Sequence, residues 1–399
     1  MGSLARMSFR PLAGMRVVDV TSSLAGPTCT EILGGLGADV VKVEHPRRGD
    51  EARAWGPAFF GSDSVMFFAA NRSKRSLALD FKDVRGREAL LRLVDRADVF
   101  VQSMRAGAAE RHGLDGETLR VRNPRIVTCS IGAFGPDGPL AGEPGYDPLM
   151  QAFAGIMSIT SEPDRPGVRV GASLIDIGTG VWAALGIVAA LLERGPDGPG
   201  REVSVALFDT ALSLVGYQLA AALKSGVAPG RHGTAFPLIA PYEVFETADG
   251  ELMIAAANDR LFELFCRRIG LPQLADDPRF ATNPDRLAHR DALLPPIRTR
   301  LAEHSSMHWL KALEGVPVAP VQDLVQVGEH PQTRAGGMLQ RVGGVEAVAA
   351  PLRVDGERLQ HSAPPPRLGE HSTGVLAELG YDDAEVEALV REGVVGSPG

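Results

Sequence analysis

The chain has 399 residues, enough for two or three ordinary domains, and 44% of them are hydrophobic and 23% charged. The net charge of −8 argues against nucleic acid or an anionic membrane as partner, because both favour a basic face. Three cysteines lie far apart, in no metal-ligand spacing, which is typical of buried thiols in a reducing compartment. With no secretory apolar segment at the N-terminus, these features predict a cytoplasmic protein without a metal site.

Short β-branched runs alternate with helix-like runs over the first 130 residues. Helices are predicted at Thr28–Leu36 and Val84–Val94, among others. Apolar strands separated by helices indicate βαβ units, a buried parallel sheet and an α/β fold, with ligands at the carboxyl ends of the strands. The predicted strands are Arg16–Val20, Asp39–Glu44, Ser76–Asp80, Asp98–Gln102 and Ile126–Ser130.

Beyond a connection rich in Gly and Pro, the pattern becomes mainly helical. It predicts a helix beginning near Asp147, and then the helix Asp176–Arg194, the strand Glu202–Val205 and a long helix over Leu207–Leu223. A turn at 248–250 separates two strand-like runs and predicts a hairpin. We expect a smaller α+β domain over about 225–330, whose elements are the strands Tyr242–Thr247 and Leu252–Ala257 and the helices Arg260–Ile269, Asp291–Glu303 and Met307–Glu314. Two short helices are expected near the C-terminus.

Asp176 begins an apolar helical run. An Asp in this place is usually an N-cap, whose carboxylate accepts backbone N–H bonds. The same position suits a nucleophile, because a helix N-terminus favours the ionised carboxylate and the small neighbours Gly178 and Gly180 leave room for a substrate. Both interpretations stay open at this point. The apolar run from Ile177 to Leu192 is short for a membrane span and is interrupted by glycines, which favours a buried helix.

Basic residues gather after the predicted strand ends. Singly they are typical of solvated surface charges, and as a group they could hold phosphates. They are Lys42, Arg47, Arg48, Arg72, Lys74, Arg75, Lys82, Arg105 and Arg111. The glycines at 34, 35 and 37 lack the spacing of a dinucleotide loop and instead predict the end of the first helix. The sequence contains no HExxH, GxSxG or Walker motif.

In chain order, motifs spread over nearly the whole sequence resemble the family III CoA-transferases, also called the CaiB/BaiF family. The segments that carry the resemblance are Arg16–Thr21, Leu24–Pro27, Leu36–Glu44, Asn71–Ser76, Leu79–Asp80, Ala97–Arg111, Gly145–Pro148, Ala240–Tyr242, Asp277–Phe280, Gly315–Pro317 and Leu368–His371.

The resemblance implies a fold that periodicity alone does not show. It implies a large Rossmann-like CoA-binding domain formed by residues 1–224 together with a C-terminal part, 331–399, and a smaller α+β domain at 225–330. It also implies an interlocked, ring-like homodimer. The expected substrates are an acyl-CoA, with succinyl-CoA as a family-level candidate, and a carboxylic acid, with no tightly bound cofactor.

The resemblance further implies that Asp176 is the catalytic nucleophile and forms an enzyme–CoA thioester. Residues that match the family's CoA contacts are Leu24, Ala25, His45, Leu79, Asp80, Lys82, Ser103, Arg105, Arg111, Tyr146 and Asp147. Some members have glutamine at the position of Leu24 and arginine at that of His45, and Ser103-Met104 replaces Asn-Phe. The glycine-rich lid of formyl-CoA transferase has no counterpart in 230–241, which disfavours oxalate and formate as substrates.

Two alternatives are weighed against transfer. Related α-methylacyl-CoA racemases carry a histidine where this chain has Tyr146, and an unperturbed tyrosine, with a pKa near 10, is a poor base at neutral pH. A non-catalytic CoA-binding protein is disfavoured because Asp176 is retained.

Overall fold

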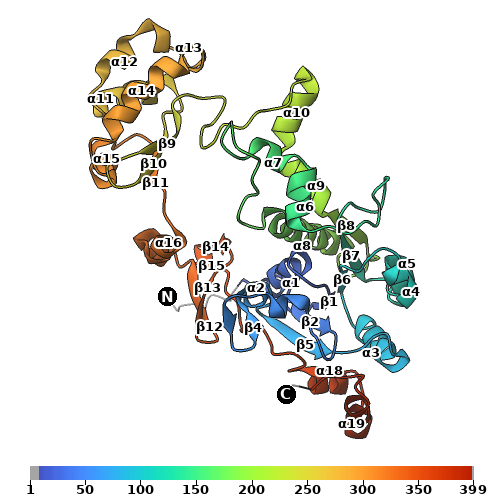
Figure 1. Ribbon diagram of the computed structural model, residues 1–399. Helices are drawn as coiled ribbons and strands as arrows, with labels where there is room; N and C mark the ends of the chain where they lie inside the picture. The colour runs from blue at the N-terminus through green and yellow to red at the C-terminus, as the bar shows by residue number, and fades with distance from the viewer. Residues whose placement is uncertain (1–8, 398–399) are drawn as a thin grey trace. The chain divides into compact units, whose positions relative to one another are not determined.

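The computed structural model describes residues 9–397, and the chain divides into two compact units. The first unit contains the described residues through Gly155, the segment Val170–Ala221 and the residues from Gln332 onward (Figure 1). The second contains Ile156–Arg169 and Ala222–Pro331. The sequence predicted a smaller domain at 225–330, which lies within the second unit. The segment Ile156–Arg169 was predicted to be part of the large domain, but by its contacts it belongs to the second unit.

A six-stranded parallel sheet forms the centre of the first unit. Its spatial order is β5-β2-β1-β6-β7-β8, so the chain order reverses between β1 and β6. The six predicted strands are confirmed, although β5 begins two residues before its predicted start. The bounds are β1 Arg16–Val20, β2 Asp39–Glu44, β5 Lys74–Ala78, β6 Val99–Gln102, β7 Val127–Gly132 and β8 Glu202–Ala206.

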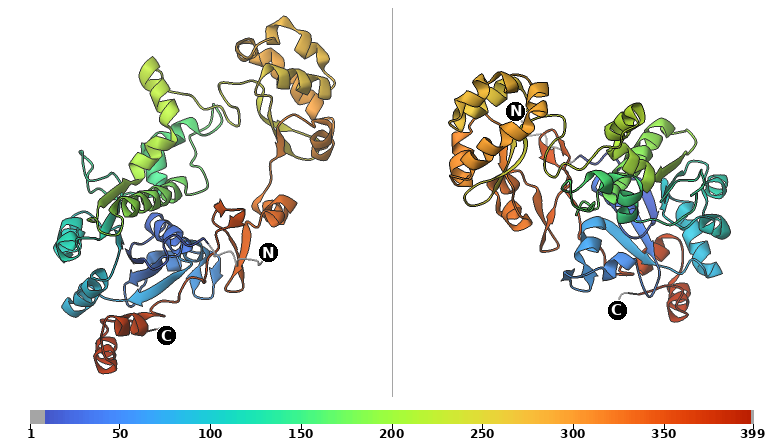
Figure 2. Two further views of the ribbon diagram at one scale, coloured as in Figure 1. Left: turned by 180° about the vertical axis from the view of Figure 1, so that it is seen from behind. Right: turned by 45° about the horizontal axis from the view of Figure 1, so that its top comes forward.

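Helices cover both faces of this sheet (Figure 2). On one face, α1 (Ala25–Gly35) and α8 (Leu174–Arg194) pack on each other and on the strands. The opposite face buries a continuous apolar core with α3 (Val84–Val94), α5 (Gly116–Arg122) and two C-terminal helices, α18 (Ser372–Glu378) and α19 (Asp383–Arg391). The C-terminal segment therefore completes the core of the N-terminal sheet. The two predicted C-terminal helices are confirmed.

The close approach of α1 and α8 depends on Gly180. A Cβ atom there would lie 2.7 Å from the Ala25 carbonyl oxygen and 2.8 Å from Thr28 Cβ, so no larger residue fits without displacing backbone. At the other end of α1, Gly37 has a φ of +102°, and the predicted glycine-rich helix end is confirmed. Gly180 therefore lets α8 approach the start of α1, and Gly37 ends α1 at its other end.

The remaining elements of the first unit are short. They are η1 Glu51–Ala54, β3 Phe59–Phe60, β4 Asp63–Ser64, α2 Val65–Ala70, α4 Ala108–His112, α6 Asp147–Phe153, α9 Leu207–Leu214, α17 Pro331–Ala335 and two hairpins, β12 Leu339–Val342 with β13 Val345–Val348 and β14 Arg353–Val354 with β15 Glu357–Arg358; α10, Gly216–Ser225, runs on past Ala221 into the second unit. The prediction of one helix over 207–223 is wrong, because the β-branched Val215 and then Gly216 interrupt it.

The second unit combines a small antiparallel sheet with helices. The predicted hairpin is confirmed as β9 and β10, and a third strand, β11, pairs with β10. Its core includes Phe245, Phe265 and Trp309. The bounds are α7 Ile156–Ile159, β9 Tyr242–Glu246, β10 Glu251–Ala255, α11 Asp259–Arg268, α12 Pro272–Asp276, η2 Pro278–Phe280, α13 Asn283–Ala288, α14 Arg290–Leu301, α15 Ser306–Ala312, β11 Val318–Pro320 and α16 Leu324–Glu329.

Helix α8 is the one helix among residues 9–397 long and apolar enough, by length and composition, to cross a membrane. Its inner face packs on α1, β7 and β8. On its outer face Val181, Trp182 and Leu185 are each about half exposed. The prediction of a buried helix is therefore correct for one face only.

Candidate active site

The reversal of strand order between β1 and β6 places two loops side by side at the carboxyl edge of the sheet. In open α/β sheets this is where ligands bind. The backbone N–H of Ser22, after β1, donates to the Ser103 hydroxyl, after β6, over 3.2 Å. Helix α1 follows directly, and its N-cap residue Leu24 makes no side-chain capping bond. The first turn of α1 thus lies at the mouth of this crevice.

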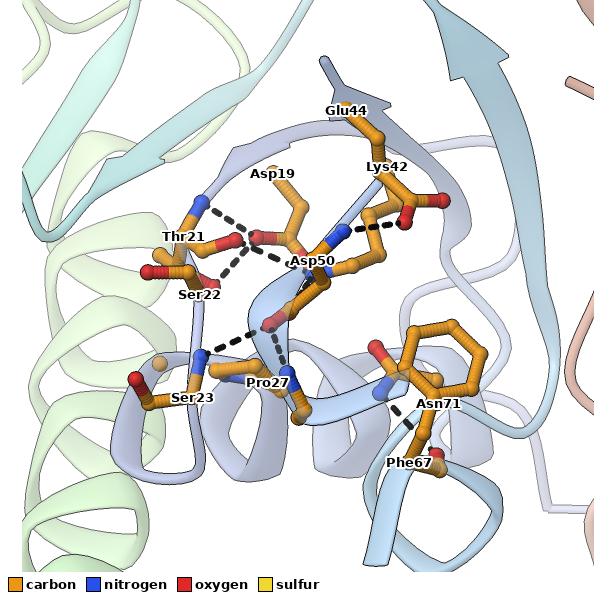
Figure 3. Close-up of polar contacts among 12 residues, drawn as sticks. Asp19, Thr21, Ser22, Ser23, Pro27, Lys42, Glu44, Asp50, Phe67 and Asn71 are labelled. Carbon is orange, nitrogen blue, oxygen red and sulfur yellow. Dashed lines mark hydrogen bonds and ion pairs between the residues drawn. The ribbon is translucent and has the colours of Figure 1, made fainter. Parts of the chain in front are cut away.

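A buried polar network lies beneath the loop after β1 (Figure 3). The Asp19 carboxylate accepts hydrogen bonds from the Thr21 N–H over 2.9 Å, from the Thr21 hydroxyl over 2.6 Å and from the Thr30 hydroxyl over 2.6 Å. Lys74 Nζ lies 3.1 Å from Asp19 Oδ2 and also donates to the Asn71 side chain. Asp19 therefore ties the loop to α1 and to β5.

A second buried pair holds the far side of the same loop. Lys42 Nζ lies 2.8 Å from Asp50 Oδ2 and donates to the Thr21 carbonyl over 3.0 Å. The other oxygen of Asp50 accepts the backbone N–H of Ser23, a residue with a φ of +70° (Figure 3). A left-handed conformation is costly for serine, so the hydrogen bond to Asp50 helps to maintain it.

The charges in this network stabilise one another. Burial alone would raise the pKa of Asp19, but the attraction of Lys74 and Lys42 and the two threonine bonds outweigh it and lower the pKa to about 2. Burial lowers the pKa of Lys74 to about 8, an effect that Asp19 only partly offsets. Burial also acts to lower the pKa of Lys42, yet Asp50, Asp19 and Glu44 raise it. Asp19, Lys42 and Lys74 are therefore ionised at neutral pH.

Asp147 holds the N-terminus of α8 from outside the helix. It is 2% exposed, and its Oδ2 accepts the backbone N–H groups of Ile175 over 2.7 Å and of Asp176 over 3.3 Å. Its Oδ1 accepts the Gln151 amide over 2.6 Å, and the Gln151 oxygen accepts the Val170 N–H over 2.8 Å. A carboxylate on α6 thus satisfies the free donors of the first turn of α8.

Asp176 lies in the first turn of α8, four residues before Gly180. Residues four apart share a helix face, so Asp176 is on the face that packs against the start of α1. No hydrogen bond or ion pair to its carboxylate is found among residues 9–397. Burial, followed by the negative charge of Asp147, raises the pKa of Asp176 to about 6. A half-buried carboxylate without a partner among residues 9–397 thus lies in the first turn of α8, on the face that packs against α1.

The sequence pattern of CoA-transferase family III matches residues 12–372. The chain is 39% identical to a succinate–glutarate CoA-transferase of Agrobacterium fabrum, covering 92% of this chain and 96% of the relative. It is also 39% identical to an acetyl-CoA:oxalate CoA-transferase of Acetobacter aceti, covering 94% and 97%. A crystal structure of a CaiB/BaiF family protein from Brucella suis superposes with a TM-score of 0.84 at 39% identity, covering 92% and 99%.

The chain belongs to the family III CoA-transferases. The resemblance seen in its motifs is confirmed, and so is the mixed α/β fold with a parallel sheet. As a CoA-transferase it is an enzyme that acts on CoA thioesters, and this sets aside the non-catalytic CoA-binding protein.

The structure brings most of the predicted CoA contacts of this transferase to one edge of the sheet. Each group follows the end of a different strand in space: Leu24 and Ala25 after β1, His45 after β2, Asp80 and Lys82 after β5, and Ser103, Arg105 and Arg111 after β6. Tyr146, the N-cap residue of α6, is 53% exposed.

Two of the predicted contacts have no side chain available to a ligand. Leu79 is 1% exposed within the core, and its N–H donates to the Glu44 carbonyl over 2.7 Å. Asp147 is buried and engaged with α8, as described above. The geometry makes Asp147 a positioning residue for Asp176 rather than a group on the path of pantetheine.

The predicted N-cap role of Asp176 is wrong. Helix α8 begins at Leu174, and Ser173 is its N-cap residue. The helix starts earlier than its own sequence indicates because Asp147, 29 residues before Asp176, supplies the capping acceptor. The alternative that was left open for Asp176, a reactive carboxylate, is compatible with this position and stays a prediction.

The proposed basic group is only partly at the ligand edge. Lys42 and Lys74 are buried in the network, Arg72 is buried against Glu31, and Arg75 pairs with Asp39 and Glu378. The charges of these four residues are therefore engaged within the protein. The members of the group that remain exposed, and so could contact phosphates, are Arg47, Arg48, Lys82, Arg105 and Arg111.

Sequence reasoning did not predict the buried network that positions this edge of the sheet. Asp50 lies in a charged segment and gave no sign of burial, and neither Asp19 nor Gln151 was predicted to hold a loop or a helix end. Asp19 in β1 and Lys42 in β2 are charged residues between β-branched neighbours. This pattern was the sequence feature that indicated buried ion pairs. In the part of the chain the structure describes, no group of three or more His, Cys, Asp or Glu side chains is arranged to hold a metal.

We expect Asp19→Asn to lower the free energy of unfolding by about 3–5 kcal/mol, because the buried Lys74 loses its counter-charge. Urea denaturation measures this change. The matched control is Asp39→Asn at the start of β2, whose partly exposed ion pairs with Arg16 and Arg75 contribute about 1 kcal/mol or less. Equal effects of the two variants would contradict the importance of the buried pair.

We expect the Asp176 carboxyl to titrate near pH 6, protonated below and ionised above, as its raised pKa requires. Carbon-13 NMR of aspartate-labelled protein, with Asp176→Asn to assign the signal, measures the midpoint. Asp147→Asn should lower it part of the way toward the ordinary value near 3.9, since burial remains when the neighbouring charge is lost. A midpoint near 4 in the unaltered protein would show that the surroundings of Asp176 do not raise its pKa.

Proposed function

We propose that this CoA-transferase moves coenzyme A from an acyl-CoA donor to a small organic acid through a thioester on Asp176. The observation that carries the proposal is the unpaired Asp176 carboxylate, on the α8 face that packs against the start of α1. Three other carboxylates near this edge of the sheet, at Asp19, Asp50 and Asp147, are buried and engaged by hydrogen bonds. Asp80 and Glu51 are less buried, and they accept hydrogen bonds from the Lys82 N–H and the Ser23 hydroxyl.

In the first half of the proposed reaction, an Asp176 oxygen attacks the donor's thioester carbonyl, forming a mixed anhydride as the CoA thiolate leaves. The thiolate then attacks the aspartyl carbonyl, giving the aspartyl-CoA thioester and releasing the donor acid as carboxylate. The acceptor carboxylate attacks this thioester, forms the second anhydride and expels the thiolate. Attack of the thiolate on the acceptor's carbonyl regenerates Asp176 and yields the new acyl-CoA.

The environment of Asp176 suits this role. With a pKa of about 6, about nine tenths of the carboxyl is ionised at pH 7, so no general base is needed. Nucleophilicity rises with basicity, and a carboxylate raised above its usual pKa is the stronger nucleophile. Asp147 contributes to the raised pKa and orients the turn that carries Asp176.

We propose that CoA lies along the carboxyl edge of the sheet. The first turn of α1, from Leu24, faces the reacting end, and the exposed Arg105 and Arg111 after β6 are available to the phosphates. The hydrogen bond between Ser22 and Ser103 would keep these two loops in register. Tyr146 stands next to Asp147 at the position where the racemases have a histidine, and a phenol is a poorer proton-abstracting base than an imidazole at neutral pH.

Succinyl-CoA as donor and a dicarboxylate as acceptor are the favoured pair. Relatives named for succinate and glutarate support this choice, including a mouse succinyl-CoA:glutarate CoA-transferase 36% identical to this chain. The lack of a glycine-rich lid at 230–241 does not exclude oxalate, because the Acetobacter aceti relative named for oxalate is as similar. The three cysteines are buried and free, which suits the proposed cytoplasmic location.

We also propose that the enzyme acts as an interlocked homodimer. The outer face of α8 and the neighbouring α6 leave large apolar side chains in water, among them Leu149, Phe153, Val181, Trp182 and Leu185, each 50% exposed or more. A contiguous apolar face of this kind favours a protein partner. We propose that a second copy of the chain covers this face. Both helices border the candidate active site, and each copy has such a site.

We expect Asp176→Asn to abolish transfer from succinyl-CoA to glutarate while CoA binding and stability change little. The matched control is Asp209→Asn, since Asp209 is also the third residue of its helix, α9, but is exposed. Donor without acceptor should leave an activated ester that hydroxylamine converts to a hydroxamate on the peptide containing Asp176, detected by mass spectrometry.

Near-normal transfer by Asp176→Asn would remove Asp176 from the mechanism. Deuterium incorporation at the α-carbon of a 2-methylacyl-CoA, with no modified Asp176, would instead favour racemisation. Loss of transfer in both Asp176→Asn and Asp209→Asn would point to misfolding rather than chemistry.

Sedimentation equilibrium should give twice the chain mass for the unaltered protein. Trp182→Glu should shift the mass toward the monomer, because a charge would be buried in the interface. The control Leu223→Glu changes an exposed apolar residue on α10 and should leave the mass unchanged. A monomeric unaltered protein that is fully active would contradict the dimer.

A further inference from the structure

A polar cavity of about 430 Å³ lies among the C-terminal hairpins of the first unit, outside the site described above. Its wall includes Gln340, Arg341, Arg353, Arg358 and His361. From these residues we propose that the cavity is a binding site for a phosphate group, either free or as a small phosphate monoester. This inference does not depend on the proposed reaction.

The positive charge of the cavity is not neutralised by the protein. Arg341 donates to the Gly344 carbonyl, Arg353 to the carbonyls of Gly356 and Gly336, and Arg358 to those of Gly336 and Ala350. No ion pair of these three arginines is found among residues 9–397, and no carboxylate lines the cavity. Backbone carbonyls thus orient the guanidinium groups while their net charge remains available to an anion.

Two side chains in the wall have buried polar atoms without hydrogen-bond partners. His361 is 8% exposed, and neither of its ring nitrogens forms a hydrogen bond. Its Nε2 lies 3.1 Å from Glu31 Oε1, which already accepts two bonds from Arg72. The Gln340 amide nitrogen donates to the Leu359 carbonyl, and its oxygen is unpaired. These atoms are closed to the cavity, so the arginines rather than His361 and Gln340 would carry the recognition of a ligand.

The arginines select the chemistry of the ligand. Guanidinium groups require acceptor oxygens with negative charge, and phosphate presents several of them in a geometry that a guanidinium binds through two N–H groups. Sulfate has the same shape but is a much weaker base, so its oxygens accept hydrogen bonds from the guanidinium groups less strongly. The cavity is larger than one phosphate, which leaves room for the rest of a small monoester.

The cavity is distinct from the CoA crevice. A Cβ atom on Gly35, the last residue of α1, would lie 3.3 Å from Leu359 and 3.4 Å from the His361 ring. Ala25, at the crevice, is the first residue of the same helix, so the two places are separated by ten residues, about 15 Å of helix. The proposed phosphate site therefore lies at the opposite end of α1 from the first CoA loop.

Isothermal titration of the full-length protein, saturated with CoA so that the crevice is occupied, tests the proposal. Inorganic phosphate should bind once per chain and more tightly than sulfate. Glycerol phosphate distinguishes the two sources: tighter binding than phosphate would identify a monoester as the ligand, and weaker binding would identify the free ion. The double variant Arg341→Gln/Arg353→Gln should weaken phosphate binding at least tenfold.

The matched control is Arg334→Gln. Arg334 belongs to the same segment but pairs with Glu346 and does not line the cavity, so its loss should leave phosphate affinity unchanged. If the double variant fails to fold, Arg341→Gln alone, which removes one 3.3 Å bond to Gly344, should still weaken binding several-fold. Absence of saturable phosphate binding, or equal affinity in the cavity variants and Arg334→Gln, would overturn the proposal.

Discussion

The buried pairs Asp19–Lys74 and Lys42–Asp50 are the interaction on which the active edge of this protein depends. Charges withdrawn from water are tolerated only when each is paired and hydrogen-bonded, and a mismatched one is expensive. This requirement fixes the relative positions of three strands and the loop after β1. Because the loop is held by Asp19 on one side and Asp50 on the other, the start of α1 is preorganised before any CoA binds.

Asp176, the proposed nucleophile, is positioned by buried polar groups in the same way on the neighbouring helix. Gly180 lets α8 approach α1, and Asp147 caps the turn that carries Asp176. Burial, and then the negative charge of Asp147, disfavour ionisation of Asp176 and raise its pKa. Asp147 therefore caps this turn and adds to the effect of burial on the pKa of Asp176.

The C-terminal segment packs against the N-terminal part of the chain in two places. Helices α18 and α19 complete the hydrophobic core beneath β5 and α3, and Val395 bridges to Leu79 next to the CoA edge. Its hairpins instead meet the other end of α1, where His361 packs on Gly35. One helix thus connects the CoA crevice with the arginine-lined cavity.

The sequence by itself determined the strands of the sheet and the family, because alternating apolar runs and motif order are local properties of the chain. Tertiary structure decided the surroundings of the charged residues. It buried Lys42 and Lys74, which sequence reasoning had grouped with possible phosphate contacts, and it moved the start of α8 by supplying Asp147 as a cap. Deciding partners can lie far along the chain: Lys74 pairs with Asp19, 55 residues before it, and Asp147 accepts the N–H of Asp176, 29 residues after it. A local pattern carries no record of which partner a charge will meet.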